Sequence, residues 1–174
     1  PYNDFVETVE KTFKIVNDNF LLVYTEIKRN SSKVILSQKK RKDIILKYYH
    51  KIKSFNKPIL QALNKSLIQQ VGSMFDQHWN LKKSLSNQIT DKKINSFYDN
   101  LVSNFNICGG KLIGAGGGGF FLVCTKNKKK LIKKLINKKI NYINFKIEKN
   151  GSKIIGYWLF FNLFKKYLWT FWFG

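Results

Sequence analysis

The chain has 174 residues, 44% of them hydrophobic, and a formal net charge of +22 at pH 7. This length suits one domain with a hydrophobic core and is too short to expect two. The apolar content excludes a disordered polyelectrolyte, and a total of two cysteines excludes a disulfide framework and a cysteine-based zinc site.

The positive charge comes almost entirely from lysine. Of the 32 basic residues, only Arg29 and Arg41 are arginines, whereas proteins that read bases or clamp phosphates depend on the planar guanidinium group. The lysines are spread among asparagines and isoleucines, all with A/T-rich codons, so we favour solvated lysine faces and expect no nucleic-acid partner. Residues 1–13 show no signal peptide. Since Cys108 and Cys124 fit reduced thiols, we expect a cytoplasmic protein.

The first predicted element is a strand over 20–26 (FLLVYTE), a short apolar run rich in β-formers. From residue 31 to about residue 101, apolar side chains recur every three or four positions, which predicts helices, four by our count. Pro58 suits the first turn of one helix, and Thr90-Asp91 offers a cap before the last.

The second half of the chain predicts a sheet. Short strands are expected at 111–113 and at 120–124 (FFLVC), and the apolar spacing of 127–139 predicts an amphipathic helix with lysines on its outer side. Residues 140–155 are expected to hold a strand, a hairpin turn at 149–152 and room for a further strand. Together these elements predict an α+β fold, an antiparallel sheet covered by helices.

Seven of the chain's eleven glycines lie between residues 109 and 125. GAGGGG at 114–119 contains G-x-G-x-x-G, but a dinucleotide fingerprint opens a helix, and here a predicted strand follows. A P-loop is excluded because Gly110-Lys111 is followed by Leu112 in place of Ser or Thr. Two interpretations remain open. One is a nest of backbone N–H groups that binds an anion, with Lys111 adding charge; the other is a wide hairpin that lets two elements pack closely.

The glycine run and two earlier segments carry a family resemblance. GGKLIGAGGGGFFLV (109–123) resembles the third, C-terminal glycine motif of the GHMP small-molecule kinases. DQHWNLKKSLSNQITDKKINSFYDN (76–100) is similar to the segment before that motif in the D-glycero-D-manno-heptose 7-phosphate kinase branch. FLLVYTEIKRNSSKVI (20–35) is similar to the strand and turn that open the second half of these enzymes. The resemblance covers about residues 20–152 and implies a ferredoxin-like GHMP kinase C-terminal domain.

Kinases of this kind transfer the γ-phosphoryl group of ATP, with Mg²⁺, to a sugar hydroxyl, so the resemblance implies ATP, Mg²⁺ and a sugar phosphate as partners. Phosphoryl transfer depends mainly on positioning and on donors that offset charge on the phosphate oxygens. The residues implied to lie against the nucleotide phosphates are Lys111, Gly114, Ala115, Gly116, Gly117, Gly118 and Gly119. His78, Trp79 and Lys82 match the upstream segment and would line the sugar-phosphate side, with ordinary helix packing as the alternative for all three.

Other parts of such a kinase are not found in this sequence. The family uses a Gly/Ser-rich phosphate loop and an aspartate that acts as, or orients, the base for the sugar hydroxyl, and both normally precede the strand matched at 20–26. No motif nominates a catalytic base or a metal ligand here. We therefore expect a sugar-kinase C-terminal half that is inactive unless an N-terminal half is supplied in cis or in trans. Residues 1–19 would be a remnant of the preceding domain and 20–153 the C-terminal domain.

The segment 154–174 is not typical of the family. From Gly156 to Gly174 it reads GYWLFFNLFKKYLWTFWFG and holds three of the four tryptophans. As a membrane span it is short, and Lys165 and Lys166 in its middle are costly there. An interfacial anchor is more plausible than a span, but we favour a read-through or out-of-frame extension over membrane contact through this tail.

Three classes of function remain. The leading one is a component of an ATP-dependent sugar kinase. The second is a non-enzymatic remnant that holds a nucleotide or a sugar phosphate through the glycine run. The third is a basic protein that binds nucleic acid or a membrane surface, for which salt-dependent binding to DNA or to anionic vesicles is diagnostic.

Overall fold

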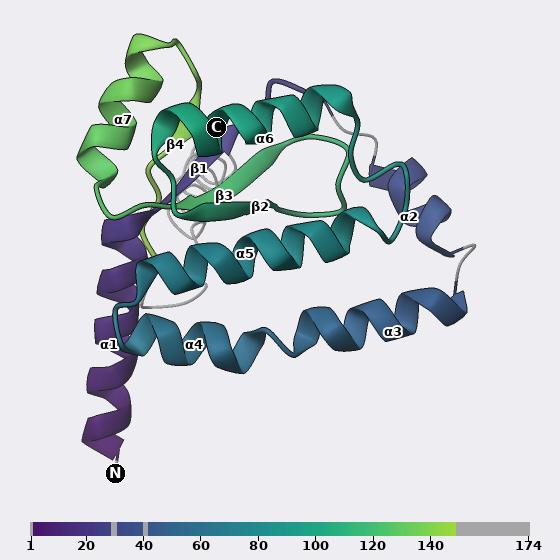
Figure 1. Ribbon diagram of the computed structural model, residues 1–174. Coiled ribbons are helices and arrows are strands. Elements are labelled where there is room, and N and C mark those ends of the chain that lie inside the picture. The colour runs from purple at the N-terminus through teal and green to yellow at the C-terminus, as the bar shows by residue number, and fades with distance from the viewer. Residues whose placement is uncertain (1, 29–30, 40–41, 149–174) are drawn as a thin grey trace, which may run out of the picture.

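The computed structural model describes residues 2–28, 31–39 and 42–148 (Figure 1). Seven helices and four strands follow one another in this part of the chain. In chain order they are α1 (Tyr2–Asn19), β1 (Phe20–Tyr24), α2 (Ser31–Lys39), α3 (Lys42–Lys53), α4 (Asn56–Asn64), α5 (Ile68–Lys83), α6 (Lys92–Phe105), β2 (Gly109–Leu112), β3 (Phe120–Cys124), α7 (Lys128–Asn137) and β4 (Tyr142–Ile143).

The four strands form one antiparallel sheet with the order β2-β3-β1-β4. The central strands β1 and β3 pair along their whole length, from Phe20 opposite Cys124 to Tyr24 opposite Phe120. The predicted α+β class, an antiparallel sheet covered by helices, is confirmed. β1, β3 and β2 meet where the glycine run joins the sheet, so the sheet positions that run.

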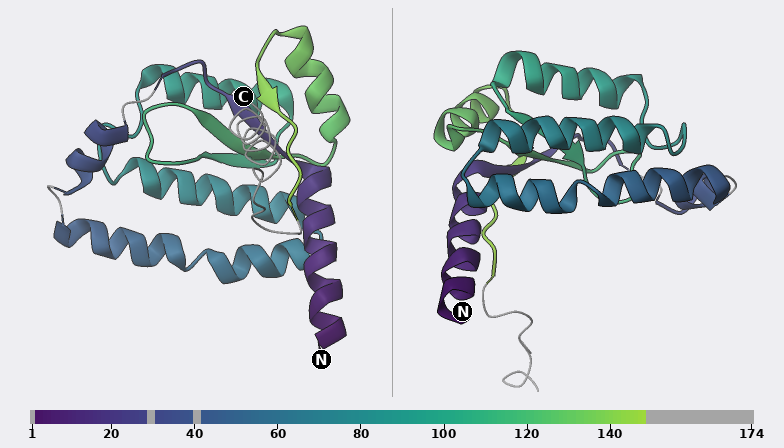
Figure 2. Two further views of the ribbon diagram at one scale, coloured as in Figure 1. Left: turned by 180° about the vertical axis from the view of Figure 1, so that it is seen from behind. Right: turned by 60° about the horizontal axis from the view of Figure 1, so that its bottom comes forward.

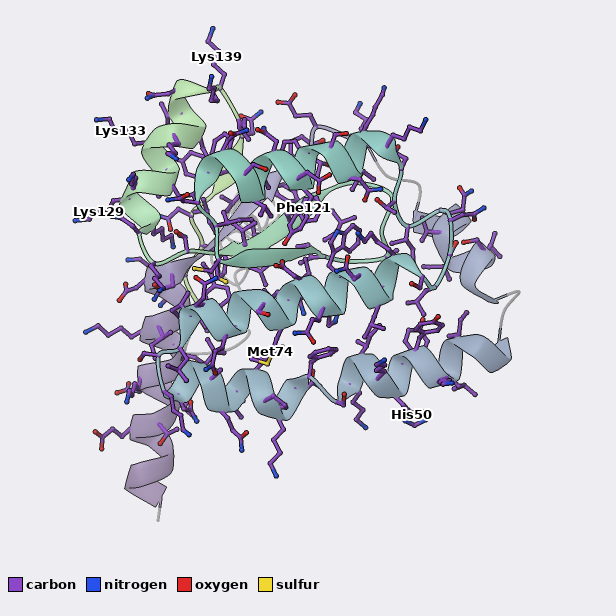
Figure 3. All side chains as sticks on the ribbon, in the orientation of Figure 1. His50, Met74, Phe121, Lys129, Lys133 and Lys139 are labelled. Atoms are coloured by element: carbon purple, nitrogen blue, oxygen red, sulfur yellow. The ribbon has the colours of Figure 1, made fainter. Side chains whose placement is uncertain are left out.

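Alternation along the strands divides the core between the two faces of the sheet. On one face, Leu21 and Val23 of β1 and Phe121 of β3 are fully buried and pack with side chains of α6 and α7. Figure 3 shows Phe121 between α5 and α6. On the other face, Phe20 and Cys124 pack with side chains of α1, α4 and α5. Helices α3 and α4 lie beyond α5 and form an outer layer (Figures 1 and 2).

Helix α5 lies along the edge strand β2, and glycines allow this close approach. A Cβ atom on Gly72 would lie 2.1 Å from the carbonyl oxygen of Cys108. From the strand side, a Cβ atom on Gly109 would lie 2.2 Å from the carbonyl oxygen of Gly72. A larger residue at either position would push the helix away from the strand. These two glycines therefore set the distance between α5 and the strand that leads into the glycine run.

Local signals predicted several elements correctly. The strand at 120–124 and the amphipathic helix α7 are confirmed, and the strand expected over 20–26 ends earlier, at Tyr24. The strand expected at 111–113 starts slightly earlier, at Gly109. Pro58 lies in the first turn of α4. Asp91 is the N-cap of α6, since its Oδ1 accepts a hydrogen bond from the Ile94 amide at 2.8 Å.

The predicted number of helices is wrong. Where four helices were expected, the structure has five, α2 to α6. Periodicity does not reveal a break that contains neither glycine nor proline, and none stands between α2 and α3. The break between α3 and α4 was marked by Pro58. The sequence predicted no helix in 1–19, yet these residues include α1. Its Ile15 is buried in the core shared with α4, and the Thr12 hydroxyl donates to Asn64 Oδ1 at 2.7 Å.

The C-terminal region contributes the edge strand of the sheet opposite to β2. Of the strand expected after residue 140, the structure shows the two-residue β4, which pairs with β1. The hairpin turn expected at 149–152 and the aromatic tail at 154–174 lie outside the described residues. No helix in the described ranges is long and apolar enough to cross a membrane.

Candidate functional site

The glycine run forms the loop between β2 and β3, here called the glycine loop (114–119). Five of its six residues have φ between +73° and +125°, namely Gly114, Gly116, Gly117, Gly118 and Gly119. This left-handed region favours glycine because a Cβ atom would be crowded by the backbone. The clustering of glycine in the sequence is therefore explained first by backbone conformation.

The loop is held between two neighbouring segments, one after β1 and one before α6. A Cβ atom on Gly116 would lie 2.9 Å from the Cα atom of Ile89. A Cβ atom on Gly118 would lie 2.4 Å from the carbonyl oxygen of Ile27. Close packing thus accounts for these two glycines. The structure supports the hairpin interpretation for them, whatever else the loop binds.

Alternate amides of the glycine loop are committed to this packing. The Gly117 amide donates to the carbonyl oxygen of Ile89 at 2.8 Å, and the Gly119 amide donates to that of Ile27 at 3.1 Å. Within the described residues, the amides of Gly114, Ala115, Gly116 and Gly118 donate to neither of these two segments. Uncommitted N–H groups in a left-handed loop are suitable donors for an anion.

Access to these donors differs along the loop. Gly116 and Gly118 are buried, whereas Gly114 is exposed and Ala115, Gly117 and Gly119 are half-buried. An anion therefore meets the rim of the loop first. It reaches the amides of the buried Gly116 and Gly118 only where the loop moves away from its neighbours. The loop is thus more closed than the nest of backbone N–H groups predicted as one interpretation of the sequence.

Lys82 links helix α5 to the start of the glycine loop. Its Nζ atom donates to the carbonyl oxygen of Leu112 at 2.9 Å and to that of Gly114. These contacts hold the backbone where β2 turns into the loop. Lys82 thus positions the loop in this structure, a task different from the sugar-phosphate contact expected of it.

Lys111 faces the flank of α5. Its Nζ atom lies 4.9 Å from the centre of the Phe75 ring, and burial lowers the pKa of its ammonium group. The half-buried cation and the aromatic face attract each other. The Lys111 ammonium group is therefore held against α5, although Lys111 itself lies at the end of β2 that leads into the glycine loop.

His78 lies near both lysines and is uncharged at neutral pH. Burial first, and then the positive charges of Lys111 and Lys82, lower its pKa to about 4. Its ring lies 6.4 Å from that of Phe55, and its Nδ1 atom is buried without a hydrogen-bond partner in another described residue. A neutral imidazole can donate or accept a hydrogen bond, but it does not attract a phosphate as a cation would.

Trp79 belongs to the hydrophobic core. It is 1% exposed, and its ring meets that of Phe121 edge-on at 5.5 Å between ring centres. Lys83 covers the outer part of the indole with Nζ 5.6 Å from the ring centre. The packing alternative raised for Trp79 is the one that its surroundings match.

A buried polar network beside the site was not predicted. The Tyr98 hydroxyl donates to Asp76 Oδ1 and contacts the carbonyl oxygen of Gly110 at 3.0 Å, and the Gly110 amide donates to Asp76 Oδ1 at 3.1 Å. Burial, and then the hydrogen bond and charge of Asp76, raise the pKa of the Tyr98 phenol. The network ties α5, α6 and β2 together. No spacing in the sequence pairs residues from two helices and a strand.

An open depression borders the loop through Ile27. It is lined by Glu26, Ile27, Asp91, Lys92 and Lys93, with the two lysines in the first turn of α6. The described ranges contain no group of three or more His, Cys, Asp or Glu side chains that could hold a metal ion. The groups around the loop are therefore backbone amides, lysine ammonium groups and the two carboxylates of this depression.

Solved structures share this fold. Mevalonate kinase from L. major, in complex with R-mevalonate, matches with a TM-score of 0.59 at 20% identity, over 69% of this chain and 38% of that one. A Lin0012 protein from Listeria innocua matches with a TM-score of 0.56 at 20% identity, over 71% of this chain and 38% of that one. The chain thus spans about two fifths of the length of these proteins. No family model and no curated protein matches it.

Mevalonate kinases are GHMP kinases, so the fold expected of a GHMP kinase C-terminal domain is confirmed. At these identities the likeness concerns the fold. Three features of the site bear on function: the glycine loop, the contacts of Lys82 and the neutral His78.

Proposed function

We propose that this chain is the C-terminal half of a GHMP-type kinase that transfers the γ-phosphoryl group of ATP to a small-molecule hydroxyl. The observation that carries the proposal is a left-handed glycine loop between antiparallel strands in a fold similar to that of mevalonate kinase. For the acceptor we propose a sugar phosphate of the heptose 7-phosphate type. That finer assignment rests on the resemblance of residues 76–100.

The glycine loop would form one wall of the nucleotide pocket. Its rim offers Gly114, Ala115 and Gly117, where little side-chain bulk would separate a phosphate oxygen from the backbone. Backbone N–H groups offset developing negative charge without needing to reorganise. Lys82 holds the entry of the loop, and Lys111 contributes a positive charge on the strand that leads into it. The Mg²⁺ of such a reaction is bound largely through substrate phosphates, and the proposal assigns it no ligand in this chain.

The second candidate is a non-catalytic remnant whose loop binds no ligand, unlike the nucleotide-holding remnant expected from the sequence, and the packing of the loop favours it. Gly116 and Gly118 are required by contacts with Ile89 and Ile27, so the run needs no ligand to explain it. Under this interpretation the chain keeps the fold of a kinase half without contributing to a nucleotide site. The two candidates differ in whether the loop responds to a nucleotide.

Glycine amide resonances provide the test. In a ¹⁵N–¹H spectrum of the whole chain, titration with Mg·ADP to about 10 mM should shift the resonances of residues 114–119, with a dissociation constant in the millimolar range. Gly72, which lies in α5 and is buried against Cys108, serves as the internal control. Its amide resonance should not shift. Shifts with ADP and with inorganic phosphate support a phosphate wall. No shift in the loop at the highest nucleotide concentration supports the remnant.

Enzyme assays test the incomplete-kinase part of the proposal. We expect no ATP turnover from residues 1–174 alone with D-glycero-D-manno-heptose 7-phosphate. Turnover should appear when a polypeptide carrying a Gly/Ser-rich phosphate loop and the catalytic aspartate is joined to it or added to it. Sustained turnover by this chain alone would contradict the assignment as a kinase half.

A further inference from the structure

Helix α7 carries a concentrated positive surface without neighbouring acids in the sequence. No aspartate or glutamate occurs from residue 100 to residue 147. Two lysines of the helix turn inward: Lys128 Nζ donates to the carbonyl oxygen of Asn17 at 2.6 Å, and Lys134 Nζ donates to that of Asn104 at 2.8 Å. The remaining lysines of this region have no such structural task.

Six lysines form what we call the α7 face. All six are exposed, and their ammonium groups make no hydrogen bond or ion pair within the described residues. Figure 3 shows Lys129, Lys133 and Lys139 projecting away from the body of the protein. The six are Lys126, Lys129, Lys130, Lys133, Lys138 and Lys139.

Exposed isoleucines lie among these lysines. Leu131 and Leu135 are buried beneath the helix, whereas Ile136 is 57% exposed. Ile136 follows Lys133 by three residues and so lies beside it on the same side of the helix. Ile143 of the nearby edge strand β4 is 46% exposed. The α7 face thus combines cationic side chains with apolar ones that the fold leaves unburied.

We propose that the α7 face binds an anionic membrane surface. Lysines are attracted to anionic headgroups, and their aliphatic stems can lie along the headgroup boundary while the charges remain in water. Exposed isoleucines gain by insertion there, whereas they have no comparable partner on the phosphate backbone of a nucleic acid. The near absence of arginine also disfavours nucleic acid as the occupant. This inference is independent of the kinase assignment, since it concerns another surface.

The test is cosedimentation of the full chain with vesicles. Binding is expected to vesicles with about 30% phosphatidylserine and to weaken with salt, with little binding to pure phosphatidylcholine. K129Q/K133Q/K139Q should lower the partition coefficient about 100-fold, because each lysine contributes about fivefold. The matched control K51Q/K53Q/K57Q removes the same charge from exposed positions in α3 and α4. It should change the partition no more than about threefold.

A further variant separates the apolar part. I136Q keeps the charge and should lower vesicle binding about fivefold. All altered side chains are exposed, so thermal unfolding should be unchanged in each variant and confirms that they fold. Equal losses in the two triple variants, or equal binding to vesicles with and without phosphatidylserine, would overturn the proposal. Binding to duplex DNA that only the α7 variant loses, with vesicle binding intact, would assign the surface to nucleic acid instead.

Discussion

Gly118→Ala tests whether the glycine loop is held by its packing on the segment after β1. Gly118 has φ +125°, a conformation that costs an alanine about 1–3 kcal/mol. The new Cβ atom would lie 2.4 Å from the carbonyl oxygen of Ile27, so the loop has to move by about 1 Å to reach ordinary contact. That movement breaks the 3.1 Å hydrogen bond from the Gly119 amide to Ile27, worth about 1 kcal/mol.

The expected total is a loss of about 2–4 kcal/mol, or a fall in Tm of about 10 °C for a chain of this size. Thermal unfolding followed by circular dichroism measures it. Gly114→Ala is the matched control, because Gly114 also has positive φ, at +75°, but is exposed, and a Cβ atom there meets no described neighbour. It should cost about 1 kcal/mol. If the two variants lose equal stability, contact with Ile27 does not explain the glycine, and the packing argument fails.

Three further predictions concern the surroundings of the loop. Because burial lowers the His78 pKa from its ordinary 6.5 to about 4, the unfolded chain binds more protons between these values. The free energy of unfolding should therefore have its full value above about pH 6.5 and fall by about 1–2 kcal/mol toward pH 4, allowing for solvent screening. Denaturant midpoints measured across this pH range should show the fall in the unaltered chain and not in His78→Gln. Gly72→Ala should destabilise by about 2–4 kcal/mol in urea unfolding, although the same change in an open helix stabilises by about 1 kcal/mol; an effect no larger than that of Ser73→Ala, at an exposed position on the same helix, would contradict the close approach of α5. Tyr98→Phe leaves the Asp76 carboxylate with one hydrogen-bond donor fewer and should cost about 1.5–3 kcal/mol in the same assay, with a loss below about 0.5 kcal/mol counting against the buried network.

Local chemistry made part of this structure predictable. The apolar runs at 20–24 and 120–124 became strands, and the spacing of leucines in 127–139 became α7, because burial of one face selects the period. Asp91 capped α6 because a short carboxylate can reach the free amides of the first turn. The glycine run indicated an unusual backbone conformation, because few other residues adopt positive φ at low cost.

Long-range contacts decided what those elements do. Trp79 could have faced a ligand or the core with the same helical spacing, and only the position of Phe121 in the folded sheet places it in the core. Likewise, Lys82 reaches the carbonyl oxygens at the start of the loop because Gly72 lets α5 approach β2 closely. Tertiary packing brings residues that are far apart in the chain into contact, and residue spacing along the sequence does not predict such contacts. The sequence alone therefore determined that residues 114–119 would form a glycine-rich turn with little side-chain bulk. The tertiary structure alone decided which of its amides are committed and which stay uncommitted.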